Sequence, residues 1–314
     1  PHLAQTYVAV YLGAGSRYET AEQNGITHAL EHMLFRGTKS YKNSTILNAE
    51  AEQTGGYLDG ATYRDHLALS TACHYLELET AIKIIAELIQ YPRYNSLATE
   101  KIILKEELLE TLDGKGRIID IDNIIHQLVF KDHALSQPIE GTLDNIAGFT
   151  KSEMESFRRQ HFTGSNMVIA IAGQIEDQQQ VIDLIAKHFA DLPMGESPII
   201  EIPSIVQSGV THKWIDSDHA SQVDIRFSFK GVPAHHKEYP ALLLLSRLLT
   251  DGQASRLYAE LIDKRGVAYS LGAGPTTYSD CGLFDFEVSV APDRAAEAVK
   301  VILDFARRCS TFRY

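Results

Sequence analysis

A repeat inside the sequence constrains the fold more than any single motif does. One constant shift of 217 positions lays two strand-like segments and one helix-like segment of the first half over three segments of the second half. The superposed pairs are 8–12 over 225–229, 66–73 over 283–290, and 81–85 over 298–302. Identities are few, so chance similarity between amphipathic patterns is the alternative, but an unchanged register across three elements favours two copies of one unit. The sequence therefore predicts a tandem duplication.

The order of elements in the first copy indicates an α+β fold. Thr6–Leu12 and Leu67–Cys73 are rich in β-branched and aromatic residues and read as strands. Leu76–Ile89 carries apolar residues every three to four positions and reads as an amphipathic helix ended by Pro92. We expect a mostly antiparallel sheet packed against helices in each copy.

The domain boundary is predicted from a change in composition. The stretch from Leu192 to Ser208 carries three prolines and no helical period. The prediction is a first domain over 1–200, a linker over 201–208 and a second domain over 209–314. The second copy reaches only the position that corresponds to residue 97, so we expect it to be truncated here and the native polypeptide to continue past Tyr314.

Charge and hydropathy exclude two classes of partner. The formal net charge is −12 and no cluster of Lys and Arg forms a basic patch, which argues against nucleic acid. No apolar run approaches the roughly 20 residues that span a bilayer, so we expect a soluble chain without a membrane span. The compartment stays open between bacterial cytoplasm, periplasm and an organelle matrix.

The segment His28-Ala29-Leu30-Glu31-His32 is an H-x-x-E-H motif in a helix-forming run. At about 100° per residue, the two histidines stand one turn apart on one face, so both imidazoles can bind one metal ion. Glu31 lies beside them, close enough to act on a water at the metal as a general base. This spacing is the inverse of H-E-x-x-H and defines the inverzincin motif.

A catalytic zinc site needs a third protein ligand, and an acidic helix offers one. Glu100 and Glu107 are seven residues apart, about two turns, and therefore share a face. One can bind the metal while the other orients a ligand or the water. The alternative is that these glutamates only solvate a surface helix.

Several ordered motifs resemble the pitrilysin, insulinase and mitochondrial-processing-peptidase family of zinc metallopeptidases. The resemblance runs from about Val8 to Phe305 and rests on GAGSRYE (13–19), NGITHALEHMLFRGT (24–38), GGYLDGAT (55–62), ILKEEL (103–108) and SRLYAELIDKRGVAYS (255–270). It implies the pitrilysin-like metalloenzyme fold and a zinc-dependent endopeptidase that acts on peptides or unfolded segments. One zinc ion per chain would be bound by His28, His32 and Glu107.

The same resemblance assigns the remaining site residues. Glu31 is the general base, and Glu100 joins it among the catalytic residues. A substrate strand would pair with the sheet edge at Asp59, Gly60, Ala61 and Thr62. The family usually has Asn-Ala where this chain has Asp59-Gly60, which alters the expected side-chain preference.

The second copy suggests a partner. Leucines stand where the shift places the H-x-x-E-H motif, so only the first copy can be catalytic. Family members often hold substrate there with an Arg and a Tyr seven residues apart; Tyr269 is present, but Ile262 occupies the Arg position. We therefore expect a homo- or heterodimer in which a homologous subunit contributes the Arg and the Tyr, as in the two-subunit processing peptidases of this family.

Two non-catalytic alternatives remain open. The chain could be a structural subunit, as in family members of respiratory complexes that have lost zinc, or a metal-dependent peptide-binding protein with negligible turnover. Both alternatives predict that loss of the Glu31 carboxylate changes nothing measurable.

Overall fold

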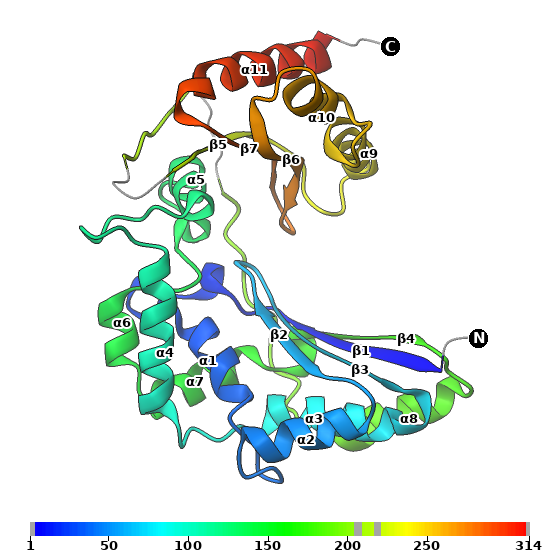
Figure 1. Ribbon diagram of the computed structural model, residues 1–314. Helices are drawn as coiled ribbons and strands as arrows, with labels where there is room; N and C mark the ends of the chain where they lie inside the picture. Colours follow the sequence, from blue (N-terminus) through cyan, green and yellow to red (C-terminus); the bar gives the residue numbers. More distant parts are fainter. Residues whose placement is uncertain (1–3, 204–208, 217–220, 312–314) are drawn as a thin grey trace. The chain divides into compact units, whose positions relative to one another are not determined.

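Two antiparallel sheets with equivalent strand order correspond to the two copies predicted from the repeat (Figure 1). The first sheet has the order β2-β3-β1-β4 and the second the order β5-β7-β6. The shift of 217 positions relates β1, Gln5–Leu12, to β5, Val223–Lys230, and β3, Leu67–His74, to β7, Gly282–Val290. The predicted α+β fold built from a duplicated unit is thereby confirmed.

The duplication extends to the register of strand pairing. Val10 lies opposite Leu69 in the first sheet, and the corresponding residues Phe227 and Phe286 lie opposite each other in the second. Val10, Leu69 and Phe286 belong to the buried core of their own unit, and Phe227 is partly buried against that of unit 2. Because a slip of one residue would turn every apolar side chain to the other face, the alternating pattern specifies this register in both copies.

The computed structural model describes residues 4–203, 209–216 and 221–311, divided into two units. Unit 1 runs to Gly116 and resumes over Asp132–Glu201, and unit 2 combines Arg117–Lys131 with the residues from Ile202 onward. Of the predicted linker 201–208, residues 204–208 lie outside the described residues. Among the described residues, none of the helices has the length and hydropathy of a transmembrane span.

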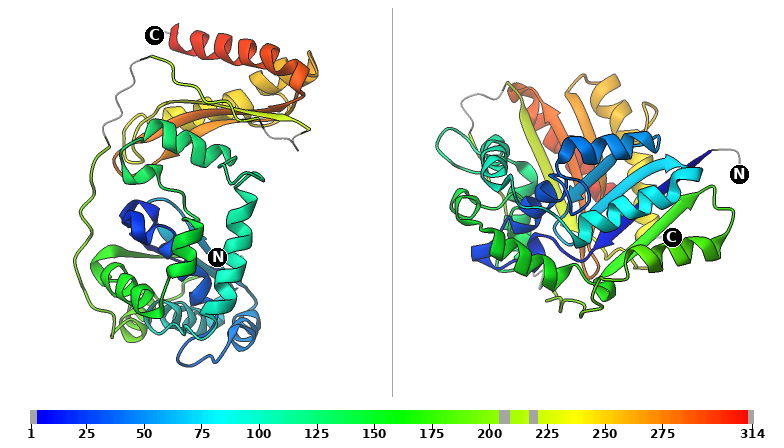
Figure 2. Two further views of the ribbon diagram at one scale, coloured as in Figure 1. Left: turned by 90° about the vertical axis from the view of Figure 1, so that its left-hand side faces the viewer. Right: turned by 90° about the horizontal axis from the view of Figure 1, so that it is seen from below.

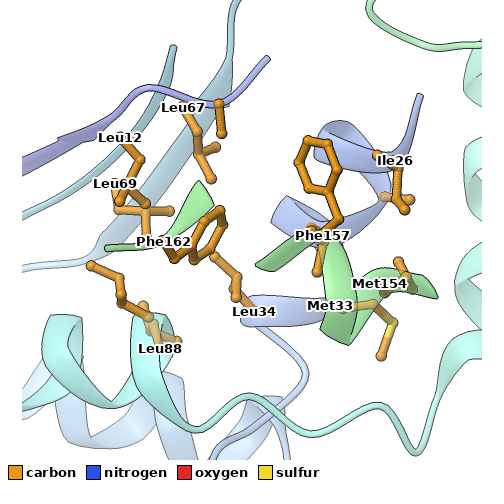
Figure 3. Close-up of a cluster of buried hydrophobic side chains, with 14 of the residues drawn as sticks. Leu12, Ile26, Met33, Leu34, Leu67, Leu69, Leu88, Met154, Phe157 and Phe162 are labelled. Carbon is orange, nitrogen blue, oxygen red and sulfur yellow. The ribbon is translucent and has the colours of Figure 1, made fainter. Parts of the chain in front are cut away.

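In unit 1 the helices cover one face of the sheet (Figures 1 and 2). Apolar residues of β1 and β3 pack against α1 and α7 in the main core, part of which Figure 3 shows. A second cluster joins Val8 and Cys73 of the sheet to α3 and α8. The other elements of this unit are α1 Ile26–Leu34, α2 Ser44–Gln53, β2 Leu58–Thr62, α3 Leu78–Gln90, α4 Leu97–Glu110, α6 Leu143–Gly148, α7 Lys151–His161, β4 Met167–Gly173 and α8 Gln178–His188.

Unit 2 contains a segment that the sequence had assigned to the first domain. The segment 117–131 includes α5, Ile121–Val129, and packs on the second sheet. Arg226 of β5 donates to Asp122 at 2.8 Å, and His126 lies 2.5 Å from the hydroxyl of Tyr278. These contacts correct the assignment of 117–131 to domain 1–200. The remaining elements are α9 Tyr239–Thr250, α10 Arg256–Tyr258, β6 Ala268–Thr277 and α11 Ala295–Thr311.

Candidate metal and catalytic site

Helix α1 presents the H-x-x-E-H motif on the face that it does not bury in the core. Ile26, Met33 and Leu34 point into the core of unit 1 and are fully buried (Figure 3). On the other face, the rings of His28 and His32 lie edge to face with their centroids 4.7 Å apart. The helical period therefore separates the residues that anchor the helix from those available for chemistry.

Helix α4 brings Glu107 to the two histidines. Its Oε2 atom lies 3.6 Å from Nε2 of His28 and 3.4 Å from Nε2 of His32. One donor atom from each of the three residues lies within 4.8 Å of the others, and the described part of the chain holds no other such cluster of His, Cys, Asp and Glu. Two imidazole nitrogens and one carboxylate oxygen match the ligand set of a catalytic zinc site.

The protonation of His28 also suits a metal ligand. Burial disfavours the charged ring, and the neighbouring His32 adds to the effect, so the pKa of His28 falls to about 4. The ring is therefore neutral at neutral pH, with a lone pair available on one nitrogen. Its Nδ1 atom is buried and makes no hydrogen bond among the described residues.

Glu100 holds His32 from the side opposite to Glu107. It has no exposed surface, and its Oε2 atom lies 3.2 Å from Nδ1 of His32. Its Oε1 atom pairs with Nε of Arg36 at 2.5 Å. A carboxylate on the far ring nitrogen fixes the tautomer and orientation of a metal-binding histidine. Two glutamates of α4, Glu100 and Glu107, thus reach His32, one at each ring nitrogen.

Glu31 lies next to the cluster and contacts the edge strand β2. Its Oε2 atom accepts a hydrogen bond from Oγ1 of Thr62 at 2.6 Å. Burial raises the pKa of Glu31, and the hydrogen bond from Thr62 offsets part of this rise. A carboxylate with a raised pKa is better matched to proton transfer near neutral pH.

A pocket of about 330 Å³ opens beside Glu31 and His32. The other residues of its wall are Phe35, Arg36, Ser44, Asn48 and Glu100. Its size is sufficient for a side chain or a short part of a peptide.

Strand β2 carries the four residues predicted to bind substrate. It lies at the edge of its sheet and pairs with β3 alone in the described structure. A β-carbon on Gly60 would stand 2.6 Å from Cε2 of Phe35 and 3.3 Å from Cγ of Glu31. Glycine at this position therefore allows the strand to approach α1 closely.

Tyr269 lies apart from these residues in the chain, on β6 of unit 2. Its side chain is exposed, and it borders a pocket of about 290 Å³ together with Tyr258 and Ile262. Its catalytic role stays a prediction, as do the roles assigned to the other site residues.

Sequence reasoning missed the contribution of Arg36 and of Phe35. Arg36 stands two residues after α1 ends at Leu34, so its closeness to the histidines along the chain was the signal that the sequence offered. Its partner Glu100 is 64 positions further along, however, and spacing alone does not connect the two.

Comparison with known proteins decides the family. Residues 1–143 match the description "Insulinase (Peptidase family M16)", and residues 148–311 match "Peptidase M16 inactive domain". The chain belongs to peptidase family M16. The resemblance of its motifs to this family is thereby confirmed.

Relatives of this M16 chain include proteins named as proteases and as processing peptidases. An uncharacterized zinc protease, YmxG, of Bacillus subtilis is 28% identical over 90% of this chain and 68% of its own length. The β subunit of the mitochondrial-processing peptidase of Dictyostelium discoideum is 26% identical over 98% of this chain and 68% of its own. These names support membership of a peptidase family.

Solved structures share the fold over nearly all of the M16 chain. The structure of a peptidase M16 inactive domain from Pseudomonas fluorescens has a TM-score of 0.87 at 21% identity, covering 100% of this chain and 76% of that one. A protease from Helicobacter pylori has a TM-score of 0.82 at 23% identity, covering 97% and 74%. At these identities the likeness concerns the fold.

Proposed function

We propose that this M16 chain is a zinc-dependent endopeptidase that hydrolyses peptides or unfolded segments of proteins. The observation that carries the proposal is the convergence of His28, His32 and Glu107, with Glu31 beside them. An acidic helix face that merely met solvent would not pair two of its glutamates, Glu100 and Glu107, with one half-buried histidine.

The donor set fits one zinc ion per chain, held by His28, His32 and Glu107. When bound, zinc supplies Lewis acidity that polarises the scissile carbonyl and lowers the pKa of water. The neutral ring of His28 and the contact of Glu100 with Nδ1 of His32 leave nitrogens free to bind the ion.

Glu31 acts as the general base. Its carboxylate removes a proton from the attacking water and delivers it to the leaving amine, so that no covalent intermediate with the enzyme is needed. The hydroxyl of Thr62 holds Oε2 of Glu31 and leaves Oε1 for this transfer. Burial favours the protonated form that exists between the two transfers.

Substrate binds as an added strand at β2. Backbone groups of residues 58–62 lie at a sheet edge and pair with an extended peptide regardless of its side chains. Thr62 joins this edge to Glu31, so a peptide seated on β2 is placed beside the base. An extended segment with all its backbone groups free to pair is typical of short or unfolded chains, which favours these as substrates.

A homologous subunit completes the active assembly. The relative from Dictyostelium is named as one subunit of a peptidase, and a solved complex III from Candida albicans contains a chain that shares the fold, with a TM-score of 0.73. Ile262 stands where a cationic residue would accompany Tyr269, so the partner would supply that group. Activity of the purified chain should rise on adding a homologous partner or on dimerisation, and full activity of a monomer would refute this part.

Glu31→Gln tests the proposed chemistry. We expect near-complete loss of turnover of a quenched peptide with zinc content retained, since the substitution removes the base and no ligand. Glu106→Gln, at an exposed position of α4, is the matched control. Equal turnover by Glu31→Gln and the unmutated chain would favour the alternative, a structural or peptide-binding M16 protein.

A further inference from the structure

The start of the metal-binding helix lacks a cap of its own. The N-cap residue of α1 is Gly25, which has a φ of 95° and no side chain to accept a hydrogen bond. A β-carbon there would stand 2.8 Å from the carbonyl oxygen of Glu140 and 2.8 Å from Cα of Gly141. The usual capping residues Ser, Thr, Asp and Asn are therefore excluded by the loop that covers this end of the helix.

Glu19 supplies the missing acceptors from six residues upstream. Its Oε2 atom accepts from the backbone N–H of Gly25 at 2.7 Å, and its Oε1 atom accepts from that of Thr27 at 2.8 Å. The side-chain amide of Asn24 donates to the same carboxylate at 3.0 Å. Glu19 is only 5% exposed, so its carboxyl group has little contact with water.

The backbone of Glu19 and the side chain of Asn24 are themselves held in place. The side chain of Gln137 donates to the carbonyl oxygen of Glu19 at 3.0 Å, and Asn24 donates to the carbonyl oxygen of Pro138 at 2.8 Å. The chain that follows β1, the first turn of α1 and the loop at 137–141 thus form one buried network. The network fixes the start of the helix relative to the sheet that anchors it.

We propose that Glu19 is a positioning residue for the metal site, acting as a remote N-cap that determines where His28 stands. Thr27, whose N–H it binds, directly precedes His28, and His28 lies in the first turn of α1. Helices fray from their ends, so an uncapped α1 would release His28 before His32. The carboxyl group of Glu19 also lies at the positive end of the helix dipole, which favours an acceptor at this place. This inference rests on the proposed zinc function.

Glu19→Gln tests the inference by keeping the size of the side chain and removing one acceptor. We expect zinc to bind about 10-fold more weakly in competition with a chelator. We also expect the visible absorption of the Co²⁺-substituted protein to change, because His28 would no longer be held in one position. Glu19→Asp keeps the charge on a shorter stem and should give an intermediate affinity, which provides a second variant if Glu19→Gln does not fold.

Glu153→Gln is the matched control. Glu153 forms the capping box of α7 with Thr150, and that helix carries no metal ligand. This control should lower thermal stability while leaving zinc affinity and the Co²⁺ spectrum unchanged. Unchanged zinc affinity in Glu19→Gln would overturn the inference alone, whereas failure of the unmutated chain to bind zinc would overturn the proposed function as well.

Discussion

Glu100→Gln tests whether the buried glutamate of α4 orients His32 or takes part in catalysis. The substitution removes a charge and leaves the side-chain volume unchanged. Glu100 has no exposed surface and pairs with Nδ1 of His32 at 3.2 Å and with Nε of Arg36 at 2.5 Å. A glutamine has one acceptor oxygen and one amide group, so either His32 or Arg36 loses its partner.

The size of the effect follows from these contacts. Partners on the far nitrogen of a metal-binding histidine typically contribute 10–100-fold to metal affinity, so the Kd for zinc should rise by roughly that factor, about 1.4–2.7 kcal/mol. The free energy of unfolding of the metal-free protein should fall by no more than about 2 kcal/mol. The loss is limited because the side chain of Arg36 is 33% exposed and can bind water instead.

Chelator competition measures the affinity, and turnover of a quenched peptide is measured at limiting and at saturating zinc. Turnover should fall at limiting zinc and recover at saturating zinc. Loss that persists at saturation would show that Glu100 takes part in catalysis, as the sequence suggested. Unchanged affinity would refute the argument that Glu100 orients His32, and Glu106→Gln again controls for the loss of a charge on α4.

Three further outcomes test other parts of the structure. Gly60→Ala should cost about 1–3 kcal/mol in urea unfolding, because its methyl would stand 2.6 Å from Phe35, and Phe35→Leu should recover part of that loss. The hydrogen bond from Arg158 lowers the pKa of Glu155 from 4.5 to about 2. The folded state therefore gains stability from Glu155 above pH 4.5 and loses it as pH falls toward 2; compared with Glu155→Gln, the unmutated chain should lose roughly 2 kcal/mol over that range. Arg226→Met should release segment 117–131 to limited proteolysis, because Arg226 pairs with Asp122 and with a buried carboxylate of β7.

The sequence predicted the features that depend on the local spacing of apolar residues. Alternation in the strands and the three-to-four-residue spacing of the helices determine which faces are buried. For this reason the constant shift of 217 positions relates the pair Val10 and Leu69 in the first sheet to the pair Phe227 and Phe286 in the second. The same geometry placed His28 and His32 on one face of α1.

Contacts between segments that are distant in the sequence could not be predicted from the spacing of apolar residues. The sequence of α5 has the pattern of an amphipathic helix, but the pattern does not say which core receives it, and the helix packs with unit 2. The pairs of Glu100 with Arg36 and of Glu19 with Thr27 depend on how α4 and the chain after β1 meet α1. Such pairs require the tertiary structure, because buried charges find whichever partner the packing brings near.

The difference between the two copies shows which residues this fold needs in order to hold a metal site. The shift that relates α1 to α9 places Leu245, Leu248 and Leu249 where the H-x-x-E-H motif stands, and Leu249 is buried in the core of unit 2. A leucine on this face is stabilised by burial alone. Histidines and glutamates on the same face lose hydration and need partners that hold them in one geometry. The position that corresponds to Glu19 is His236, so the second copy lacks this carboxylate as well as the ligands, and the Nδ1 atom of His236 accepts instead from the backbone N–H of Glu238, the N-cap residue of α9. Loss of the carboxylate together with the ligands is expected if Glu19 serves the metal-binding helix. An M16 chain that kept the ligands but had lost an acceptor at the position of Glu19 would contradict that link.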